Sequence, residues 1–233
     1  MEIKTNEFSS FLNKVVMTGT QGLGEAILLF DSEGLKIKAA SETNQSMVDS
    51  ILRKEAFKDY EELGKICIND LQTVKKVMKR FDGTVKLSKK GNLLKIYTKG
   101  KQVEIELVDE SFMKDDKKDP NLEFDDSFIM TGKQLKNIFD DVSLSRDSII
   151  IINTEDKLVK FSNTGKYKFL TEFEAPNCKG GVKVSFGTPL IDAVSELRGD
   201  LECSVKSEYP IQIVEKTKFS EIKIIIAPLV TDE

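Results

Sequence analysis

The residues of this chain that could perform chemistry are mainly carboxylates and lysines, because its 233 residues include no histidine. The absence of histidine removes the commonest general base and metal ligand, together with every Ser-His and Cys-His catalytic device. Two adjacent carboxylate pairs, Asp115-Asp116 and Asp140-Asp141, could in principle bind a metal or exchange protons. Adjacent side chains on a helix point apart, however, and charges in a connecting segment are usually solvated. We therefore expect no catalytic residue, no metal site and no cofactor.

The remaining candidates for phosphate binding indicate contact that does not depend on the base sequence of a nucleic acid. Gly22-Leu23-Gly24 is a weak phosphate-loop signal, because the third glycine is missing and a strand follows it. Lysine suits mobile contact with phosphates better than bidentate reading of bases. Because most basic residues are lysines, the composition favours a tether on nucleic acid over a sequence-specific regulator. The only arginines are Arg53, Arg80, Arg146 and Arg198.

An apolar helix pattern that occurs four times must position these side chains. Each copy places apolar residues at relative positions 0, 3, 4 and 7, which share one side of a helix. The second copy has lysine at one of these positions. A short apolar segment that alternates like a strand precedes each copy. The stripes are Phe8-Phe11-Leu12-Val15, Leu71-Val74-Lys75-Met78, Leu135-Ile138-Phe139-Val142 and Leu190-Ala193-Val194-Leu197.

Predicted strands fill most of the chain between these helices. Several alternate apolar and polar residues, as expected for antiparallel sheets with one face in water. Runs of strands with few helices indicate an α+β class, built from four copies of a unit with one helix and several strands. The predicted strands are 1–3, 26–30, 35–40, 47–52, 66–68, 84–87, 93–98, 102–108, 128–130, 148–152, 158–161, 167–173, 182–186, 201–205, 211–215 and 221–227.

Composition indicates a globular protein of a reducing compartment. Hydrophobic residues make up 39% and charged residues 32%, and no apolar run approaches the roughly 20 residues that span a bilayer. The N-terminus lacks the regions of a signal peptide. Three distant cysteines, Cys67, Cys178 and Cys203, predict buried thiols and no disulfide frame. The net charge of −4, with the second half more acidic than the first, does not by itself indicate a nucleic-acid binder.

A charged segment that ends in Pro120 interrupts every periodicity near the middle of the chain. Such a segment predicts a linker between two similar halves, each with two helix-containing units. We expect an N-terminal domain at residues 1–108, an interdomain connector at 109–123 and a C-terminal domain at 124–233.

The chain length, the similar halves, the four helices and the central linker resemble DNA sliding clamps of the proliferating cell nuclear antigen (PCNA) type, in their archaeal and eukaryotic form. Specific stretches support the resemblance, which covers essentially the whole chain. They are Asp31–Leu35, Pro120–Phe124 at the exit of the connector, Leu158–Gly165 in a second-half turn, Tyr209–Val214, and Lys223–Pro228 with the closing Thr231-Asp232-Glu233.

The resemblance implies the DNA-clamp, or processivity, fold, with two similar domains that each place two helices on one face of antiparallel sheets. In this family three subunits close head to tail into a pseudo-six-fold ring around duplex DNA. The implied function is a non-catalytic processivity factor in DNA replication and repair, whose partners are DNA polymerase, other clamp-binding-peptide proteins and a clamp loader. The implied location is intracellular: the archaeal cytoplasm with its nucleoid, or the eukaryotic nucleus.

The resemblance also assigns three surfaces. DNA would meet basic residues on or beside the polar helix faces, namely Lys14, Lys76, Lys79, Arg80, Lys133 and Lys136. A partner peptide would dock in an apolar pocket of Ala40, Asn44, Met47, Leu122, Phe124, Pro210, Ile225, Ala227 and Pro228. Subunits would join through the edge strands 102–108 and 167–173, with Val103, Ile105, Tyr167 and Phe169 as apolar contacts.

The chain departs from the family pattern in two places. Its connector residues 114–119 are unusually charged, which bears on affinity and peptide preference. Acidic residues also stand on helix faces where the family often has basic or neutral ones: Asp140, Asp141, Asp192 and Glu196. Two alternatives stay open. One is a clamp-fold subunit of a heterotrimer, or an interaction module, that does not encircle DNA by itself. The other is a carboxylate-dependent enzyme on an unrelated α+β fold.

Overall fold

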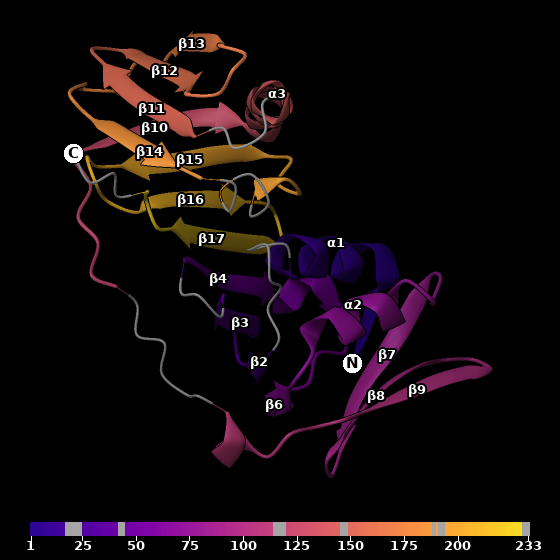
Figure 1. Cartoon of the computed structure of the whole chain (residues 1–233). Coiled ribbons are helices and arrows are strands. Elements are labelled where there is room, and N and C mark those ends of the chain that lie inside the picture. Colours follow the sequence, from indigo (N-terminus) through magenta and orange to yellow (C-terminus); the bar gives the residue numbers. More distant parts are fainter. Residues whose placement is uncertain are drawn as a thin grey trace. The chain divides into compact units, whose positions relative to one another are not determined.

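The computed structural model describes residues 1–16, 25–41, 45–113, 120–144, 149–187, 190 and 194–229 (Figure 1). The chain forms two compact units. Unit 1 comprises Met1–Lys118 and Thr217–Ile222, and unit 2 comprises Asp119–Lys216 and Lys223–Glu233. The C-terminal part of the chain is therefore divided between the units, with Thr217–Ile222 in unit 1 and the residues after it in unit 2.

Helices form where the apolar stripes predict them. α1 (Thr5–Val16) and α3 (Gly132–Ser143) bury all four stripe residues. α2 (Leu71–Met78) buries its three apolar stripe residues, while Lys75, the lysine of that stripe, is partly exposed. Burying one such side chain contributes about 1.5–3 kcal/mol, so packing stabilises these helices more than intrinsic propensity does. α3 also begins with a capping box, in which Thr131 and Gln134 satisfy each other's backbone N–H groups.

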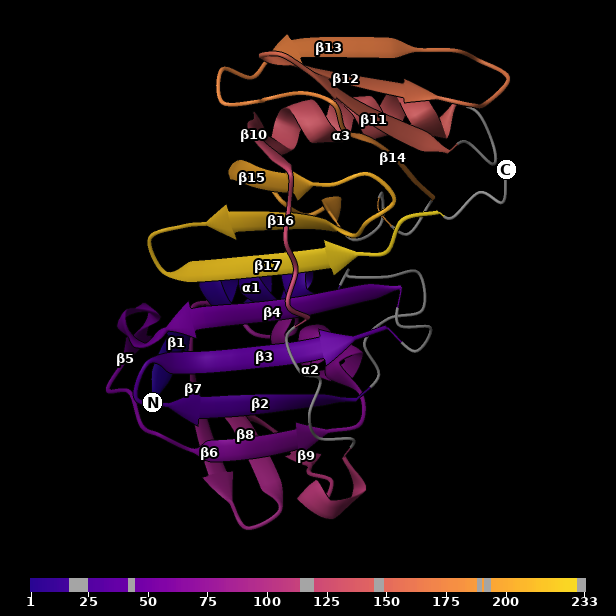
Figure 2. The same ribbon diagram turned by 90° about the vertical axis from the view of Figure 1, so that its left-hand side faces the viewer.

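Unit 1 contains two antiparallel sheets and two helix-containing repeats. The first strand of each repeat pairs with a strand of the other repeat. One sheet has the order β5-β1-β7-β8-β9, and the other contains β6-β2-β3-β4. β1 leads into α1 but pairs with β7, whereas β6 leads into α2 but pairs with β2. α1 packs against α2, and Figure 2 shows both helices behind the layer of β2, β3, β4 and β6. The bounds are β1 (Glu2–Lys4), β2 (Ala26–Asp31), β3 (Gly34–Ala40), β4 (Ser46–Arg53), β5 (Phe57–Lys58), β6 (Gly64–Ile68), β7 (Thr84–Lys90), β8 (Leu93–Thr98) and β9 (Lys101–Glu106), with short 3₁₀ helices η1 (Lys54–Ala56) and η2 (Glu110–Phe112).

Unit 2 repeats the same exchange. One sheet has the order β13-β12-β11-β14, and the other contains β10-β15-β16-β17. β10 leads into α3 but pairs with β15, and β14 pairs with β11. The bounds are β10 (Asp126–Thr131), β11 (Ile150–Glu155), β12 (Leu158–Asn163), β13 (Leu170–Glu174), β14 (Lys183–Phe186), β15 (Asp200–Val205), β16 (Ile211–Lys216) and β17 (Ser220–Ile226), of which Ser220–Ile222 belong to unit 1.

The fourth predicted helix falls partly outside the described residues. Leu190 and Val194 are helical and buried, and Leu197 is buried. Ala193 of the predicted stripe lies outside the described part of the chain.

One predicted strand begins later than its periodicity indicates. The expected strand 167–173 starts at Leu170, because the side chain of Asn163 takes the place of a ladder partner. Its Nδ2 donates to the carbonyl oxygen of Tyr167 at 2.8 Å, and its Oδ1 accepts from the N–H of Phe169 at 3.1 Å. These two contacts hold residues 167–169 beside β12 without a backbone ladder.

Another predicted strand ends early. The expected strand 102–108 ends at Glu106, because the N–H of Val108 donates to the carbonyl oxygen of Cys67 on β6 at 3.0 Å and so leaves the ladder with β8. The expected strand 148–152 begins at Ile150, and Ser148 lies outside the described residues. The two-residue strand β5 was not predicted, since its length carries no periodicity.

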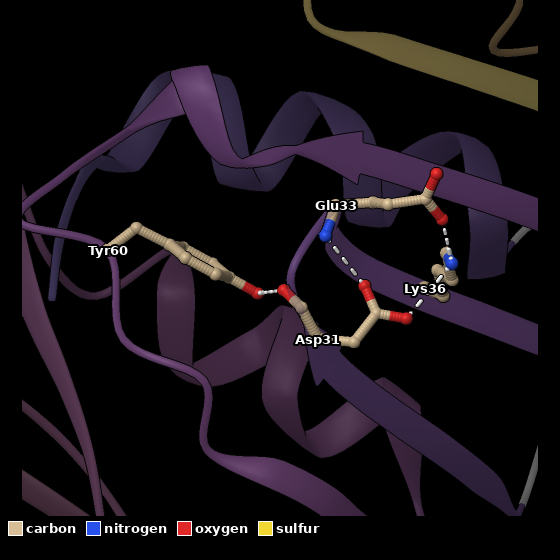
Figure 3. Close-up of polar contacts among 4 residues, drawn as sticks. All are labelled: Asp31, Glu33, Lys36 and Tyr60. Atoms are coloured by element: carbon tan, nitrogen blue, oxygen red, sulfur yellow. Dashed lines mark hydrogen bonds and ion pairs between the residues drawn. The ribbon is translucent and has the colours of Figure 1, made fainter.

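A polar network stabilises the β2–β3 turn (Figure 3). The Asp31 carboxylate accepts from the N–H of Glu33 at 2.9 Å, and Lys36 forms ion pairs with both Asp31, at 2.9 Å, and Glu33. The Tyr60 hydroxyl donates to the carbonyl oxygen of Asp31 at 2.9 Å. The hydrogen bond from Lys36 lowers the pKa of Asp31, while burial and the charge of Asp31 raise the pKa of Tyr60 to about 12. Near neutral pH the Asp31 carboxyl group therefore stays ionised and the Tyr60 hydroxyl stays protonated, which preserves the hydrogen bonds of the turn.

The three cysteines are buried and unbridged, as the sequence predicts. Burial raises the pKa of Cys203, so that thiol is held in its inert protonated form. Among the helices that the structure describes, none has the length and apolar character to cross a membrane.

Candidate nucleic-acid and partner interfaces

Unit 1 gathers basic residues on and beside its two helices. Lys14 lies half-buried in the last turn of α1, and Lys76 is exposed on α2. Lys79 and Arg80 are exposed and follow α2 directly. Because α1 and α2 pack side by side (Figure 1), these four cations belong to one helix pair. This pair is the strongest candidate for contact with phosphates.

Lys101 adds a cation that the sequence analysis did not assign. Its Nζ donates to the carbonyl oxygen of Arg80 and lies 4.8 Å from the centre of the Phe81 ring. The β8–β9 turn therefore holds a lysine beside the C-terminal end of α2. No spacing in the sequence could reveal this neighbour, because residues 80 and 101 come together only when the sheet forms.

Lys14 is less freely presented than Lys76. It lines a cavity of about 270 Å³ beside α1, whose other walls include Glu7, Leu52 and Phe219. Lys14 is half-buried, so part of its stem is covered, as is common for long basic side chains.

The basic residues of α3 stand among acidic ones. Lys133 and Lys136 are both exposed, but Lys136 Nζ forms an ion pair with Asp140 Oδ2 at 2.7 Å, one helical turn away. Asp141 is also exposed. A lysine with a carboxylate partner on its own helix attracts phosphate less strongly than an isolated one. Of the other two acidic residues on the polar faces, Glu196 is half-buried and Asp192 lies outside the described residues.

The residues predicted for the peptide pocket are distributed over both units. In unit 1, Ala40 and Met47 are directly paired on β3 and β4 and half-buried. Asn44 lies outside the described part of the chain.

In unit 2, the aromatic ring of Phe124 meets the ring of Tyr209 edge to face, with 6.0 Å between centroids. Tyr209 was not among the predicted pocket residues, although it belongs to a stretch that carries the resemblance. Ile225 is only 8% exposed, so it serves mainly as a core residue of β17. The half-buried residues of the predicted pocket in this unit are Leu122, Phe124, Pro210, Ala227 and Pro228.

The predicted subunit contacts lie at two sheet edges. β9 is the last strand of its sheet in unit 1, where Val103 and Ile105 are half-buried. β13 is the last strand of its sheet in unit 2; Phe169 just before it is half-buried, and Tyr167 is 61% exposed. Leu170, which opens β13 and was not predicted as a contact, is 63% exposed. Open edges with exposed apolar groups are liabilities that proteins usually cover.

Asp126 is a buried carboxylate of unit 2 with a clearly lowered pKa, yet its surroundings favour structure over catalysis. It accepts from the Cys178 thiol at 2.9 Å and from the N–H groups of Lys179 and Gly180 at 3.0 and 2.9 Å. Burial opposes ionisation, but these donors outweigh it and lower the pKa of Asp126 to about 2. Burial and the neighbouring carboxylate raise the pKa of Cys178 to about 11. At neutral pH the pair therefore supplies neither a general base nor a thiolate.

No cluster of three or more metal-ligating side chains occurs among the described residues.

Comparison with known proteins agrees with the fold that these elements build. No protein-family model matches the chain. The chain is 28% identical over 147 residues to the DNA polymerase sliding clamp of Nanoarchaeum equitans (strain Kin4-M), a match that spans 59% of this chain and 58% of that relative. The matched segment is thus under two thirds of the relative's own length.

Solved structures match over nearly the full length of both chains. The PCNA of A. fulgidus, solved with the C-terminal region of FEN-1 bound, has a TM-score of 0.88 and 17% identity, and the match covers 100% of this chain and 98% of that one. A chain of the PCNA2–PCNA3 complex from Sulfolobus tokodaii has a TM-score of 0.79 and 16% identity, with coverage of 98% and 99%. These findings confirm the resemblance to PCNA-type sliding clamps, and this chain has the PCNA-like DNA-clamp fold.

Proposed function

We propose that this protein is a DNA sliding clamp: a non-catalytic processivity factor that closes into a ring around duplex DNA. The observation that carries the proposal is the clamp fold of the described residues, with three helices beside antiparallel sheets in two units and a basic helix pair in unit 1. The sequence likeness to a DNA polymerase sliding clamp supports the same function. The proposed partners are duplex DNA, a DNA polymerase and other replication and repair proteins, a clamp loader and further copies of the chain. Such a protein would work inside the cell, with the DNA.

The proposed mechanism is topological. A closed ring cannot dissociate sideways, so a polymerase bound to it stays on its template. Weak contact between lysines and phosphates permits sliding, because the backbone charge is uniform along the duplex. The inferred contacts are Lys14, Lys76, Lys79 and Arg80, with a smaller share from Lys133 and Lys136.

Retention on DNA tests this mechanism. After loading with a clamp loader, the protein should stay on a covalently closed circle through a high-salt wash, and cutting the circle should release it. Equal retention on linear and circular DNA would contradict encirclement, because ordinary binding does not depend on free ends.

We also propose that a partner peptide docks at the apolar residues around the connector exit, among them Leu122 and Phe124. The A. fulgidus protein binds the C-terminal region of FEN-1, which supports a peptide partner for this chain as well. A few anchors should dominate the affinity, because such interfaces concentrate their energy in buried apolar contacts. Calorimetry with a clamp-binding peptide should show a loss of about tenfold or more for Leu122→Ala. Ile129→Ala on β10 removes an exposed aliphatic side chain elsewhere in unit 2 and should leave affinity unchanged. Equal affinities for all three proteins would place the pocket elsewhere.

The second candidate function is that of one subunit in a heteromeric clamp. The likeness to a chain of a PCNA2–PCNA3 complex and the acidic character of the second half support this alternative. A subunit of this kind would stay monomeric alone and assemble only with a different clamp chain, which light scattering of the pure protein and of mixtures would distinguish.

A further inference from the structure

The cavity of about 270 Å³ beside α1, called the α1 cavity from here on, has walls that belong entirely to unit 1. α1 provides one side of it. The other side comes from the end of β4, from η1 and from the turn that leads into β17. Its volume lies close to the lower end of the roughly 300–1,000 Å³ that is usual for small-molecule sites. The α1 cavity is therefore large enough for one compact chemical group.

The walls of the α1 cavity are partly apolar and aromatic. Phe11 and Leu52 line it and are each only 3% exposed, while Phe219 and Ala56 line it and are half-buried. Apolar groups that border a water-filled hole gain when an apolar ligand replaces the water. A flat ring or an aliphatic group of a ligand would thus be favoured inside.

The Phe219 backbone is fixed on both sides. Its N–H donates to Thr217 Oγ1 at 3.3 Å, and its carbonyl oxygen accepts from the N–H of Arg53 at 2.8 Å. Thr217 Oγ1 also accepts from the N–H of Ser220 at 3.0 Å. The turn therefore presents an aromatic residue at a defined place, and a preorganised wall reduces the entropy lost on binding.

Three lysines lie in or next to the walls of the α1 cavity. Lys14 is part of the lining. Lys218 Nζ lies 4.8 Å from the centre of the Phe219 ring, so a second cation stands beside the aromatic wall. Lys54 is exposed in η1, the short helix that also contains the lining residue Ala56. An anionic group of a ligand would therefore meet positive charge near the opening.

The carboxylates of this region oppose an anion only weakly. Glu7 lines the cavity but pairs with Lys4 at 3.8 Å. Glu221, which follows the turn, pairs with Arg53 at 3.5 Å. Glu55 of η1 is exposed. Because two of these three carboxylates have a basic partner, the three lysines leave the region with a net positive charge.

We propose that the α1 cavity binds one unpaired nucleotide of single-stranded nucleic acid, with its base against Phe219 and its phosphate beside Lys14 and Lys218. Single strands are commonly held by stacking on aromatic side chains next to basic residues. A duplex would not fit, because its bases are stacked inside the helix. The hydroxyl groups of Ser10 and Thr217 can bond to a sugar or a base edge. Because single-strand binding needs no closed ring, this inference goes beyond the proposed function.

The competing occupant is an acidic peptide with an apolar side chain. The position of the cavity favours the nucleotide, because Lys14 of α1 is also an inferred contact for duplex phosphates. A strand that separates from the duplex would therefore reach the cavity along the same helix.

Fluorescence anisotropy with a labelled short oligothymidylate tests the proposal. Phe219→Leu keeps an apolar side chain for folding but removes the ring, so affinity should fall about fivefold or more. Phe219→Tyr keeps the ring and should bind like the wild type. Phe112→Leu is the matched control, because Phe112 is a 76% exposed phenylalanine of η2 in the same unit, and it should leave affinity unchanged. Equal affinities for the wild type and Phe219→Leu would overturn the proposal.

Salt dependence gives a second readout of the same complex. Lys218→Ala should lower the slope of log affinity against log salt by roughly 0.7 for the oligothymidylate, the value for one phosphate contact on a single strand. An unchanged slope would contradict a phosphate at this lysine.

The failure of this inference can be told apart from the failure of the clamp function. A protein that stays on closed circular duplex but does not bind the oligothymidylate would overturn the nucleotide site alone. Binding of a glutamate-rich peptide in place of the oligothymidylate would also overturn it, and would assign the cavity to a protein partner. Oligothymidylate binding that depends on Phe219, without retention on circles, would support the site and contradict only the clamp function.

Discussion

Asp126 illustrates at the residue scale how a buried charge is kept stable. Its carboxylate accepts hydrogen bonds from the Cys178 thiol and from the N–H groups of Ser127, Lys179 and Gly180. These contacts join the start of β10 to the loop before β14. The carboxylate is therefore a structural element of unit 2, and its contribution should depend on pH.

Replacing Asp126 by Asn should destabilise the protein by about 2 kcal/mol at pH 7, because the folded pKa of about 2 lies below the unfolded value of 3.8. This stabilisation is present above the unfolded pKa and is lost as pH falls toward 2. Urea unfolding should thus show a wild-type advantage at pH 7 that shrinks between about pH 4 and 2.

The adjacent Asp125 provides a control, since it is exposed and lies 3.7 Å from Lys206. Asp125→Asn should change the free energy of unfolding by less than about 1 kcal/mol. A loss as large as that of Asp126→Asn would indicate that charge in this region, not the donor set around Asp126, sets stability.

Gly34 in the β2–β3 turn is constrained twice. Its φ of 143° is rare for other residues, and a Cβ there would lie 2.2 Å from the carbonyl oxygen of Leu52. Gly34→Ala should therefore cost about 3 kcal/mol or more. Gly91 is the control, because it has a φ of 60° but open space around it. Gly91→Ala should therefore show only the cost of the backbone conformation, about 1 kcal/mol of unfolding free energy. Equal thermal or urea stabilities for the two variants would show that β4 yields to the added methyl group.

At the scale of elements, the helix periodicity was the sequence feature that predicted the structure most reliably. The stripes of α1, α2 and α3 were predicted residue by residue, because a buried helix face must repeat every 3.6 residues. Strand ends were predicted less well, since they depend on single contacts such as the Asn163 side chain at residues 167–169. Lys101 and Leu170 could not be assigned, because only sheet formation brings one to α2 and leaves the other at an open edge.

The helix pair of unit 1 gives a prediction for DNA binding. Lys76→Ala with Lys79→Ala removes two exposed cations, so the slope of log affinity against log salt should fall by roughly 0.9 per lost phosphate contact. Fluorescence anisotropy with a short duplex at several salt concentrations measures this slope.

Lys136→Ala is the matched control, because that lysine already pairs with Asp140 on its own helix. Its slope should therefore fall by less than the slope of the Lys76/Lys79 variant. If the Lys76/Lys79 variant also keeps the wild-type slope, the faces of α1 and α2 are solvated surfaces and do not meet phosphates.

At the scale of the whole molecule, each unit consists of two repeats that exchange their first strands. This exchange was not predicted, because strand pairing over long sequence separations leaves no periodic signal. It explains why each unit forms one body from two similar repeats. Within the described parts of the chain, β9 is the last strand of its sheet in unit 1 and β13 is the last strand of its sheet in unit 2. One chain thus presents two different edges, which is the requirement for head-to-tail closure.

The central claim is that copies of this chain close into a three-membered ring, and the solution mass tests it most directly. Light scattering during size-exclusion chromatography of the pure protein at micromolar concentration should give three times the 26.2 kDa of one chain. The mass should stay constant as the protein is diluted through this range, because each subunit of a closed ring is held by two interfaces. A mass of one chain at all concentrations, or a mass that grows continuously without stopping at three, would contradict the ring.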